Sequence, residues 1–161
     1  MKMIVGALSM AFVLSPLAAA ASTDDMGSFR PLAGGWKCAG SFAANGRPIE
    51  ATVSVAWDAA TESIFVRHDD LPPNGFHAVE LWGKAHGGGY RASIADAYSG
   101  IRWLTSSGWA AGALEWTRME AGIPVEKFRY SQVSATGFQL EWFVFDKDGQ
   151  PKLGDSLQCR R

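Results

Sequence analysis

Two histidines with neighbouring carboxylates form the part of this sequence best suited to chemistry. His68 and His77 flank the segment 69–76, and Asp69 and Asp70 follow His68 directly. If this segment is a hairpin loop, the two imidazoles stand opposite one another with Cβ atoms about 5 Å apart. Such a pair could contact a ligand, titrate between about pH 5 and 8 or contribute to a metal site. The pattern supplies no third fixed ligand, so we predict no metal and no cofactor; ligand contact and a solvated loop remain open.

Three further ionisable side chains, Arg118, Glu126 and Asp155, project toward the same end of the expected fold. An inward carboxylate such as Asp155 needs a partner or water, because an unpaired buried carboxylate is costly. The sequence contains no nucleophile elbow, C-x-x-C, H-E-x-x-H or phosphate-binding glycine loop. We therefore assign no catalytic residues. An isomerase or hydrolase that uses His68, His77 and Asp155 remains an alternative.

Turn-forming residues divide the chain after residue 33 into ten short segments rich in β-branched and aromatic residues. The turns lie at 45–46, 59–61, 74–75, 87–89, 96–100, 106–108, 121–122, 136–137 and 148–149. No window has a helical period, and this spacing is typical of an antiparallel meander. We predict an all-β fold, a single closed up-and-down barrel of about ten strands over residues 22–161, with an irregular lead-in segment before residue 34.

The hairpins at Asn45-Gly46 and Asp148-Gly149 fix the register of four strands, because side chains alternate between the two faces of a strand. The predicted opposite pairs are Cys38 with Val53, Trp36 with Val55, Phe138 with Cys159, Trp142 with Asp155, and Val144 with Leu153. Both cysteines then lie on the inward faces of the first and last strands. An even-stranded meander brings these strands together, so we predict a Cys38–Cys159 disulfide at the seam, with two buried free thiols as the alternative.

Seven tryptophans are many for 161 residues. They either fill the barrel or line a ligand cavity, and the sequence does not separate these readings. The predicted ligand-binding residues are His68, His77, Trp103, Trp116, Tyr130, Trp142 and Asp155. We expect Trp36, with Phe29 and Leu32, to plug one end of the barrel. The opposite, hairpin end is then the mouth, where an amphipathic ligand would hold its polar head outward.

Residues 1–21 have the pattern of a secretory signal peptide. Lys2 precedes an apolar run that is too short to span a bilayer, and small residues at 18–21 resemble a cleavage site. We predict a periplasmic or secreted protein that begins near Ser22, with a membrane anchor as the alternative. The net charge of −1 and the pI near 6.3, without a basic stripe, favour neither a nucleic-acid partner nor an anionic membrane. We expect a monomer or a weak homodimer.

The segment Leu32-Ala33-Gly34-Gly35-Trp36, with its G-x-W core, resembles the first-strand signature of lipocalin-like (calycin) barrels and the openings of nitrobindin-like proteins. Uncharacterised bacterial exported lipocalin-like proteins are also similar at 81–83, 106–109 and 157–161. The resemblance implies a barrel that holds a small hydrophobic molecule, with Arg160 or Arg161 packed over Trp36. It also implies that haem is absent, because the late histidine of nitrobindins is missing from 152–161.

These observations predict an exported β-barrel that binds a small hydrophobic or amphipathic molecule in its lumen without transforming it. The alternatives are the enzyme described above and a packed envelope protein that acts through its surface. An open cavity of a few hundred Å³ would favour a binder or an enzyme over the packed barrel.

Overall fold

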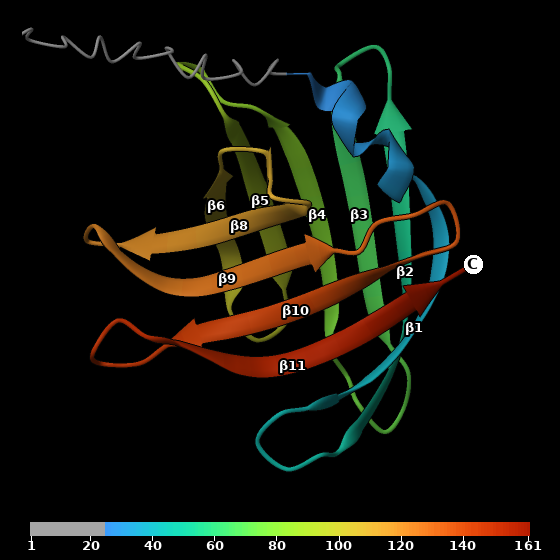
Figure 1. Ribbon diagram of the computed structural model, residues 1–161, viewed down its shortest axis with the longest axis vertical. Coiled ribbons are helices and arrows are strands. Elements are labelled where there is room, and N and C mark those ends of the chain that lie inside the picture. The colour runs from blue at the N-terminus through green and yellow to red at the C-terminus, as the bar shows by residue number, and fades with distance from the viewer. Residues whose placement is uncertain (1–24) are drawn as a thin grey trace, which may run out of the picture.

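Ten long antiparallel strands and one very short strand form a single closed sheet in the computed structural model, which describes residues 25–161. The elements are η1 (Met26–Leu32), β1 (Gly34–Phe42), β2 (Pro48–Asp58), β3 (Ser63–Asp70), β4 (His77–Lys84), β5 (Tyr90–Asp96), β6 (Gly100–Ser106), β7 (Trp109–Ala110), β8 (Ala113–Glu120), β9 (Ile123–Ser131), β10 (Gly137–Phe145) and β11 (Pro151–Arg160). Figure 1 shows β8 to β11 crossing in front of the steeper strands β3 to β6, with η1 at the upper end.

Closure of the barrel occurs at two places. β1 pairs with β11 along six residue pairs, from Lys37 opposite Arg160 to Phe42 opposite Asp155. β6 meets β8 through the pair Thr105 and Thr117. All nine predicted turn regions separate consecutive long strands, so the all-β up-and-down barrel is confirmed.

The first hairpin has a longer loop than predicted. Phe42 N–H donates to the Arg47 carbonyl at 3.0 Å, which leaves four residues, 43–46, in the loop. Cys38 therefore lies opposite Ala51 and not opposite Val53, and Trp36 lies opposite Val53 and not Val55. The predicted register was wrong by two residues, but a shift of two preserves the face of every side chain.

The last hairpin follows the prediction up to a β-bulge. Trp142 lies opposite Asp155, and Phe138 lies opposite Cys159. Beyond Trp142 the register shifts by one, so that Phe143, and not Val144, lies opposite Leu153. Gly154 is the residue that the bulge leaves unpaired, and a Cβ there would overlap the Trp142 ring, so a glycine lets that indole lie against β11.

The lead-in segment is ordered as a 3-10 helix, which the sequence analysis missed. Met26, Phe29 and Leu32 recur every third residue, which is the period of this helix, and all three are fully buried. Asp25 Oδ1 accepts a hydrogen bond from Gly27 N–H at 2.8 Å and caps the first turn. The buried face of η1 therefore closes one end of the barrel.

An aromatic cluster fills the lumen beneath η1. The Phe29 ring meets Tyr90 edge-on, with centroids 4.7 Å apart, and Trp82 contacts both Trp116 at 5.0 Å and Tyr130 at 5.3 Å. Edge and tilted contacts of this kind stabilise a core beyond the area that they bury. This half of the barrel is packed with side chains.

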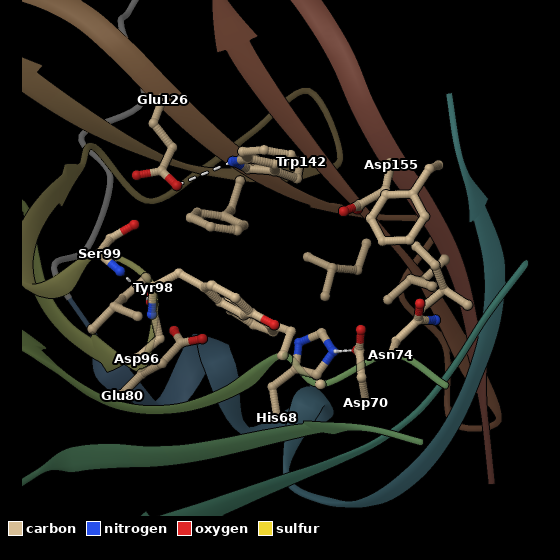
Figure 2. A pocket seen from close by; sticks show the side chains of 18 of the residues that line it. His68, Asp70, Asn74, Glu80, Asp96, Tyr98, Ser99, Glu126, Trp142 and Asp155 are labelled. Carbon is tan, nitrogen blue, oxygen red and sulfur yellow. Dashed lines mark hydrogen bonds and ion pairs between the residues drawn. The ribbon is translucent and has the colours of Figure 1, made fainter. Parts of the chain in front are cut away.

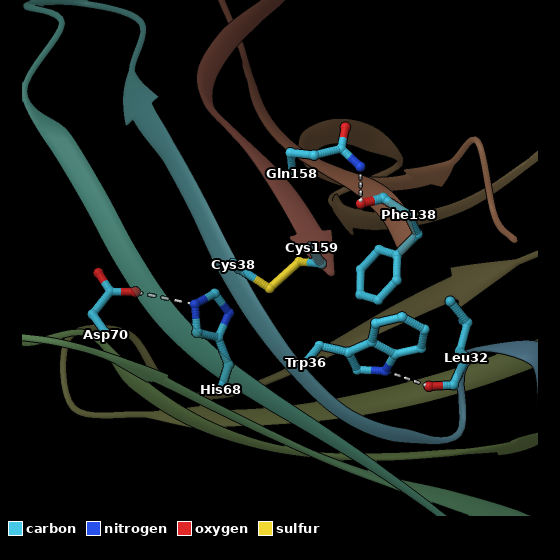
Figure 3. Close-up of a disulfide and its surroundings, with 8 residues drawn as sticks. All are labelled: Leu32, Trp36, Cys38, His68, Asp70, Phe138, Gln158 and Cys159. Carbon is cyan, nitrogen blue, oxygen red and sulfur yellow. Dashed lines mark hydrogen bonds and ion pairs between the residues drawn. A yellow bond between two sulfur atoms is a disulfide. The ribbon is translucent and has the colours of Figure 1, made fainter. Parts of the chain in front are cut away.

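The seam between β1 and β11 carries the Cys38–Cys159 disulfide (Figure 3). Close to it, Trp36 Nε1–H donates to the Leu32 carbonyl at 2.8 Å, and the ring packs against Phe138 with centroids 4.9 Å apart. The Arg161 guanidinium lies over the Trp36 ring at 4.3 Å. The predicted disulfide is confirmed, and Arg161 takes the position that the resemblance left to either terminal arginine.

Residues 1–21, the predicted signal peptide, lie outside the described residues. Within residues 25–161, no helix is long and apolar enough to cross a membrane.

Candidate functional site

A cavity of about 510 Å³ occupies the other half of the lumen. Its walls come from β1 to β6 and β9 to β11, and its rim comes from the loops β1–β2, β3–β4 and β5–β6. These loops lie at the end opposite η1, which is the end predicted to be the mouth. The lining residues are Phe42, Arg47, Ile49, His68, Asp70, Pro73, Asn74, Gly75, Phe76, Glu80, Ile94, Asp96, Tyr98, Ser99, Arg102, Glu126, Phe128, Tyr130, Leu140, Trp142, Asp155 and Leu157.

Two aromatic rings from different loops meet at the mouth. Tyr98, in the β5–β6 loop, stacks on Phe76, in the β3–β4 loop, with centroids 6.3 Å apart and planes 4° apart. Phe76 in turn meets His68 edge-on at 5.3 Å. Tyr98 is 72% exposed although it lines the cavity. The stack therefore forms a rim that is apolar on its inner side and open to solvent on its outer side.

His68 and Asp70 form a polar pair on the β3 wall. They are two residues apart, so both side chains point inward, and His68 Nε2 lies 3.0 Å from Asp70 Oδ1. Asp70 is buried, with 6% of its surface exposed. The carboxylate thus holds the imidazole in one orientation at the edge of the cavity (Figure 2).

Asp155 lies across the cavity from this pair, in β11 (Figure 2). Its carboxylate forms no hydrogen bond or ion pair with any described residue, and its register partners are aromatic: Phe42 in β1 and Trp142 in β10. Burial raises the pKa of Asp155 to about 6; nearby His68 opposes this rise and nearby Asp70 adds to it. Asp155 is therefore a carboxylate that titrates just below neutral pH in the cavity wall.

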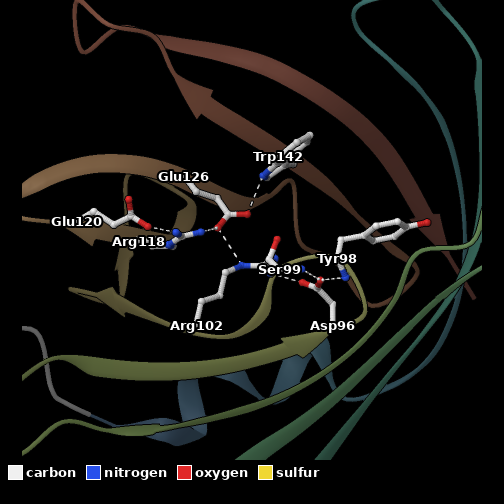
Figure 4. A network of polar contacts seen from close by, with 8 residues as sticks. All are labelled: Asp96, Tyr98, Ser99, Arg102, Arg118, Glu120, Glu126 and Trp142. Carbon is white, nitrogen blue, oxygen red and sulfur yellow. Dashed lines mark hydrogen bonds and ion pairs between the residues drawn. The ribbon is translucent and has the colours of Figure 1, made fainter.

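A buried ion network forms another part of the wall (Figure 4). Arg102, 7% exposed, pairs with Asp96, and its Nε lies 2.9 Å from Glu126 Oε2. Glu126 also accepts a hydrogen bond from Trp142 Nε1–H at 3.0 Å and lies 3.6 Å from Arg118 Nη1. Arg118 and Glu126 are thus used in structural pairing, and Trp142 is held in place by its indole N–H.

Asp96 links the ion network around Arg102 to the β5–β6 loop at the mouth. Its Oδ1 accepts backbone N–H groups of Tyr98 at 2.8 Å and Ser99 at 2.7 Å, and its Oδ2 faces Arg102. Burial acts to raise the pKa of Asp96, but the hydrogen bond from Ser99 and the contacts with Arg102 and Tyr98 outweigh burial, so that the pKa lies below its usual value. This carboxylate fixes the loop from which Tyr98 reaches over the cavity.

The floor of the cavity is where polar groups meet the aromatic cluster. Glu80 Oε2 accepts the indole N–H of Trp82 at 2.7 Å, yet burial raises the pKa of Glu80 above its usual value. Tyr130 is 3% exposed, lines the cavity, and its hydroxyl makes no hydrogen bond with a described residue. Burial, with Glu80 nearby, raises the pKa of Tyr130 well above its usual value, so the phenol stays neutral.

Of the residues predicted to bind ligand, His68, Tyr130, Trp142 and Asp155 line the cavity together. Trp116 points inward but lies in the aromatic cluster, with 1% of its surface exposed, and is not in the cavity wall. Phe29, Leu32 and Trp36 are buried at the η1 end, where a plug was predicted.

His77 and Trp103 lie on the outer face of the barrel, contrary to the predicted orientation. Asp69, and not His68, stands opposite His77, and His77 Nδ1 lies 2.9 Å from Asp69 Oδ1 outside the barrel. Trp103 is 63% exposed. In both strands the alternation is one residue out of phase with the prediction, which put His77 on the inward face with Val79 and counted Trp103 among the inward tryptophans.

The sequence analysis missed Glu80, Arg102 and Tyr98 as parts of the site. Glu80 and Arg102 are isolated charges within apolar strands, at positions i−2 to the buried residues Trp82 and Leu104. This spacing of two is a signal that could have placed both charges on the inner face. Tyr98 lies in a loop, where no periodicity indicates its direction.

No group of three or more His, Cys, Asp or Glu side chains within residues 25–161 is arranged to hold a metal ion. Comparison with protein-family models gave no match to this chain, and comparison with curated proteins gave none either.

Proposed function

We propose that this protein is an exported, lipocalin-like barrel that binds a small hydrophobic or amphipathic molecule in its lumen and does not transform it. The observation that carries this proposal is the cavity of about 510 Å³, which lies in the usual range for small-molecule sites of about 300–1,000 Å³. Aromatic and aliphatic residues make up half of its lining, and most of the other lining residues are polar or charged, so the site suits a molecule with an apolar part and a polar part.

The division of the lumen into two halves supports a binder over a packed barrel. The half beneath η1 is filled by Trp82, Trp116 and their neighbours, whereas the half toward the mouth is open. A barrel that acted only through its surface would have no need of buried charges such as Arg102 facing an open lumen, since burial of charge is costly. The lipocalin-like assignment is supported by the packing of Arg161 over Trp36.

Export is supported by the disulfide, because such bonds persist in oxidising compartments. Periplasmic or secreted localisation, following removal of residues 1–21, fits this bond.

The experiment that tests ligand binding is native mass spectrometry of the purified protein after exposure to a total lipid and metabolite extract. The expected spectrum contains a complex of one protein with one small molecule, which is released unchanged on denaturation. A spectrum of the unliganded protein alone would count against a binding function.

An acid–base enzyme is the second candidate, and one observation favours it. His68, oriented by Asp70, faces Asp155, whose pKa of about 6 is close to neutral, as general acid–base catalysis requires. The same experiment separates the two functions, because an enzyme would release a chemically altered molecule.

A further inference from the structure

We propose that the molecule bound in the lumen carries a protonated amine and that the carboxylate of Asp155 is its counter-ion. This inference rests on the proposed function and gives the chemical class of the ligand.

The balance of charge in the cavity wall favours a cation. The lining contains five carboxylates and two guanidinium groups, and Arg118, just outside the lining, brings a third guanidinium to Glu126, which leaves an excess of two acidic groups before His68 is counted. The acidic lining residues are Asp70, Glu80, Asp96, Glu126 and Asp155. A concave site with this excess attracts cations and repels anions, and the low polarity of its walls strengthens both effects.

Four of the five carboxylates are already engaged within the protein. Asp96 and Glu126 both face Arg102. Asp70 contacts His68, and Glu80 accepts the indole N–H of Trp82. Each of these groups therefore has a partner that a ligand would have to displace.

Asp155 is the carboxylate that has no such partner among the described residues. Its neighbours in the sheet are Phe42 and Trp142, and the faces of aromatic rings attract cations. The Arg47 guanidinium already lies over Phe42 at 4.7 Å, so this wall of the mouth does accommodate a cation. A carboxylate flanked by two aromatic residues is a suitable site for an ammonium group.

Tyr130 places a second polar group in the wall of the same cavity. It is 97% buried and lines the cavity, yet its hydroxyl has no hydrogen-bonding partner in residues 25–161. The hydroxyl oxygen is accessible from the cavity and is not among the fully buried polar atoms that lack a partner in residues 25–161. A ligand with hydrogen-bonding groups in addition to its apolar part would satisfy this hydroxyl.

The charged groups that face Asp155 set its behaviour with pH. His68 and Asp70 face it from β3, and Arg47 lies at the rim beside Phe42. Glu126 stands farther along the wall, on β9, and is tied to Arg102. Because burial raises the pKa of Asp155 to about 6, its carboxylate is ionised at pH 7.5 and largely protonated at pH 5.

The test is isothermal titration calorimetry with three probes that share one chain length: decylamine, decanoate and decan-1-ol. At pH 7.5 the parent protein should bind decylamine about 10- to 100-fold more tightly than decan-1-ol, and decanoate most weakly. At pH 5 the advantage of decylamine should shrink severalfold. Asp155→Asn should abolish that advantage at pH 7.5 while decan-1-ol binds within about twofold of the parent.

Asp148→Asn is the matched control, because Asp148 is an exposed carboxylate in the β10–β11 loop whose side chain contacts Lys147. It removes the same charge and should leave all three affinities unchanged. Equal binding of decylamine and decan-1-ol, or an unaltered preference in Asp155→Asn, would overturn the proposal. Tighter binding of decanoate that is lost in Arg47→Ala would also overturn it. Binding of none of the three probes would contradict the proposed function itself.

Discussion

Asp155 is the residue on which the proposed recognition of the ligand depends. It is partly buried, with Phe42 and Trp142 as its neighbours in the sheet, and it forms no hydrogen bond or ion pair with a described residue, although nearby His68 favours its ionised form. A carboxylate kept in such a place reduces the stability of the folded protein above its pKa, because ionisation is less favourable there than in the unfolded chain.

This cost predicts how stability varies with pH. The pKa of Asp155 is raised from 3.8 to about 6, so the folded protein binds this proton more tightly than the unfolded chain. The resulting stabilisation is present at low pH, is lost as the pH rises from about 4 to about 6, and stays absent above that range. Asp155→Asn should therefore increase the free energy of unfolding at pH 7.5 by on the order of 2 kcal/mol and change it little at pH 4.

Urea denaturation at a series of pH values measures this effect, with Asp148→Asn as the exposed control. A loss of stability at pH 7.5 in Asp155→Asn would mean that the carboxylate has a stabilising partner.

Among the elements, β4 and β6 are the strands whose inward and outward faces are hardest to predict from the sequence. Both strands carry large apolar side chains on the outside, such as Leu81 and Trp103, and charged side chains on the inside, namely Glu80 and Arg102. Hydrophobicity alone predicts the reverse orientation. The alternation of β2 and β10 was predictable because their inner faces are apolar, whereas β4 and β6 each present a charge to the cavity and break the pattern at the candidate site.

The 3-10 helix η1 gives a prediction about the stability contributed by a single element. Phe29 is fully buried and contacts Trp82, Tyr90 and Trp116, so Phe29→Ala should lower the free energy of unfolding by about 3–5 kcal/mol. The adjacent Arg30 is exposed and lies over Trp57 at 5.1 Å, so Arg30→Ala should cost less than about 1 kcal/mol.

Chemical denaturation of Phe29→Ala and Arg30→Ala under the same conditions measures both changes in the free energy of unfolding. Equal effects would show that η1 does not close the barrel in solution.

For the whole molecule, the seam between β1 and β11 joins the two ends of the meander. The Cys38–Cys159 bond links residues 121 positions apart, and closing so long a loop stabilises a protein by about 4–5 kcal/mol in the chain-entropy model. The double variant Cys38→Ala, Cys159→Ala should therefore unfold at a markedly lower temperature. Thiol titration of the unreduced, denatured protein should detect no thiol, and two titratable thiols would refute the bond.

The architecture was predictable to a greater extent than the cavity. Nine turn regions and the shared face of Cys38 and Cys159 followed from local patterns. The volume of the lumen did not, because it depends on which large side chains meet across the barrel. Trp82 and Trp116 meet and fill one half, whereas Trp142 is held at the wall by Glu126 and leaves the other half open.

The most direct test of the central claim, that the open half of the lumen is a binding site, compares two variants in the native mass spectrum of extract-exposed protein. Leu140→Trp adds bulk to the cavity wall, where Leu140 is 4% exposed, and Val79→Trp adds similar bulk to the outer face, where Val79 is 49% exposed. We predict that the parent and Val79→Trp retain one small molecule for each chain, and that Leu140→Trp, still folded, retains none. Equal retention by both variants would show that the molecule binds elsewhere and would contradict the account.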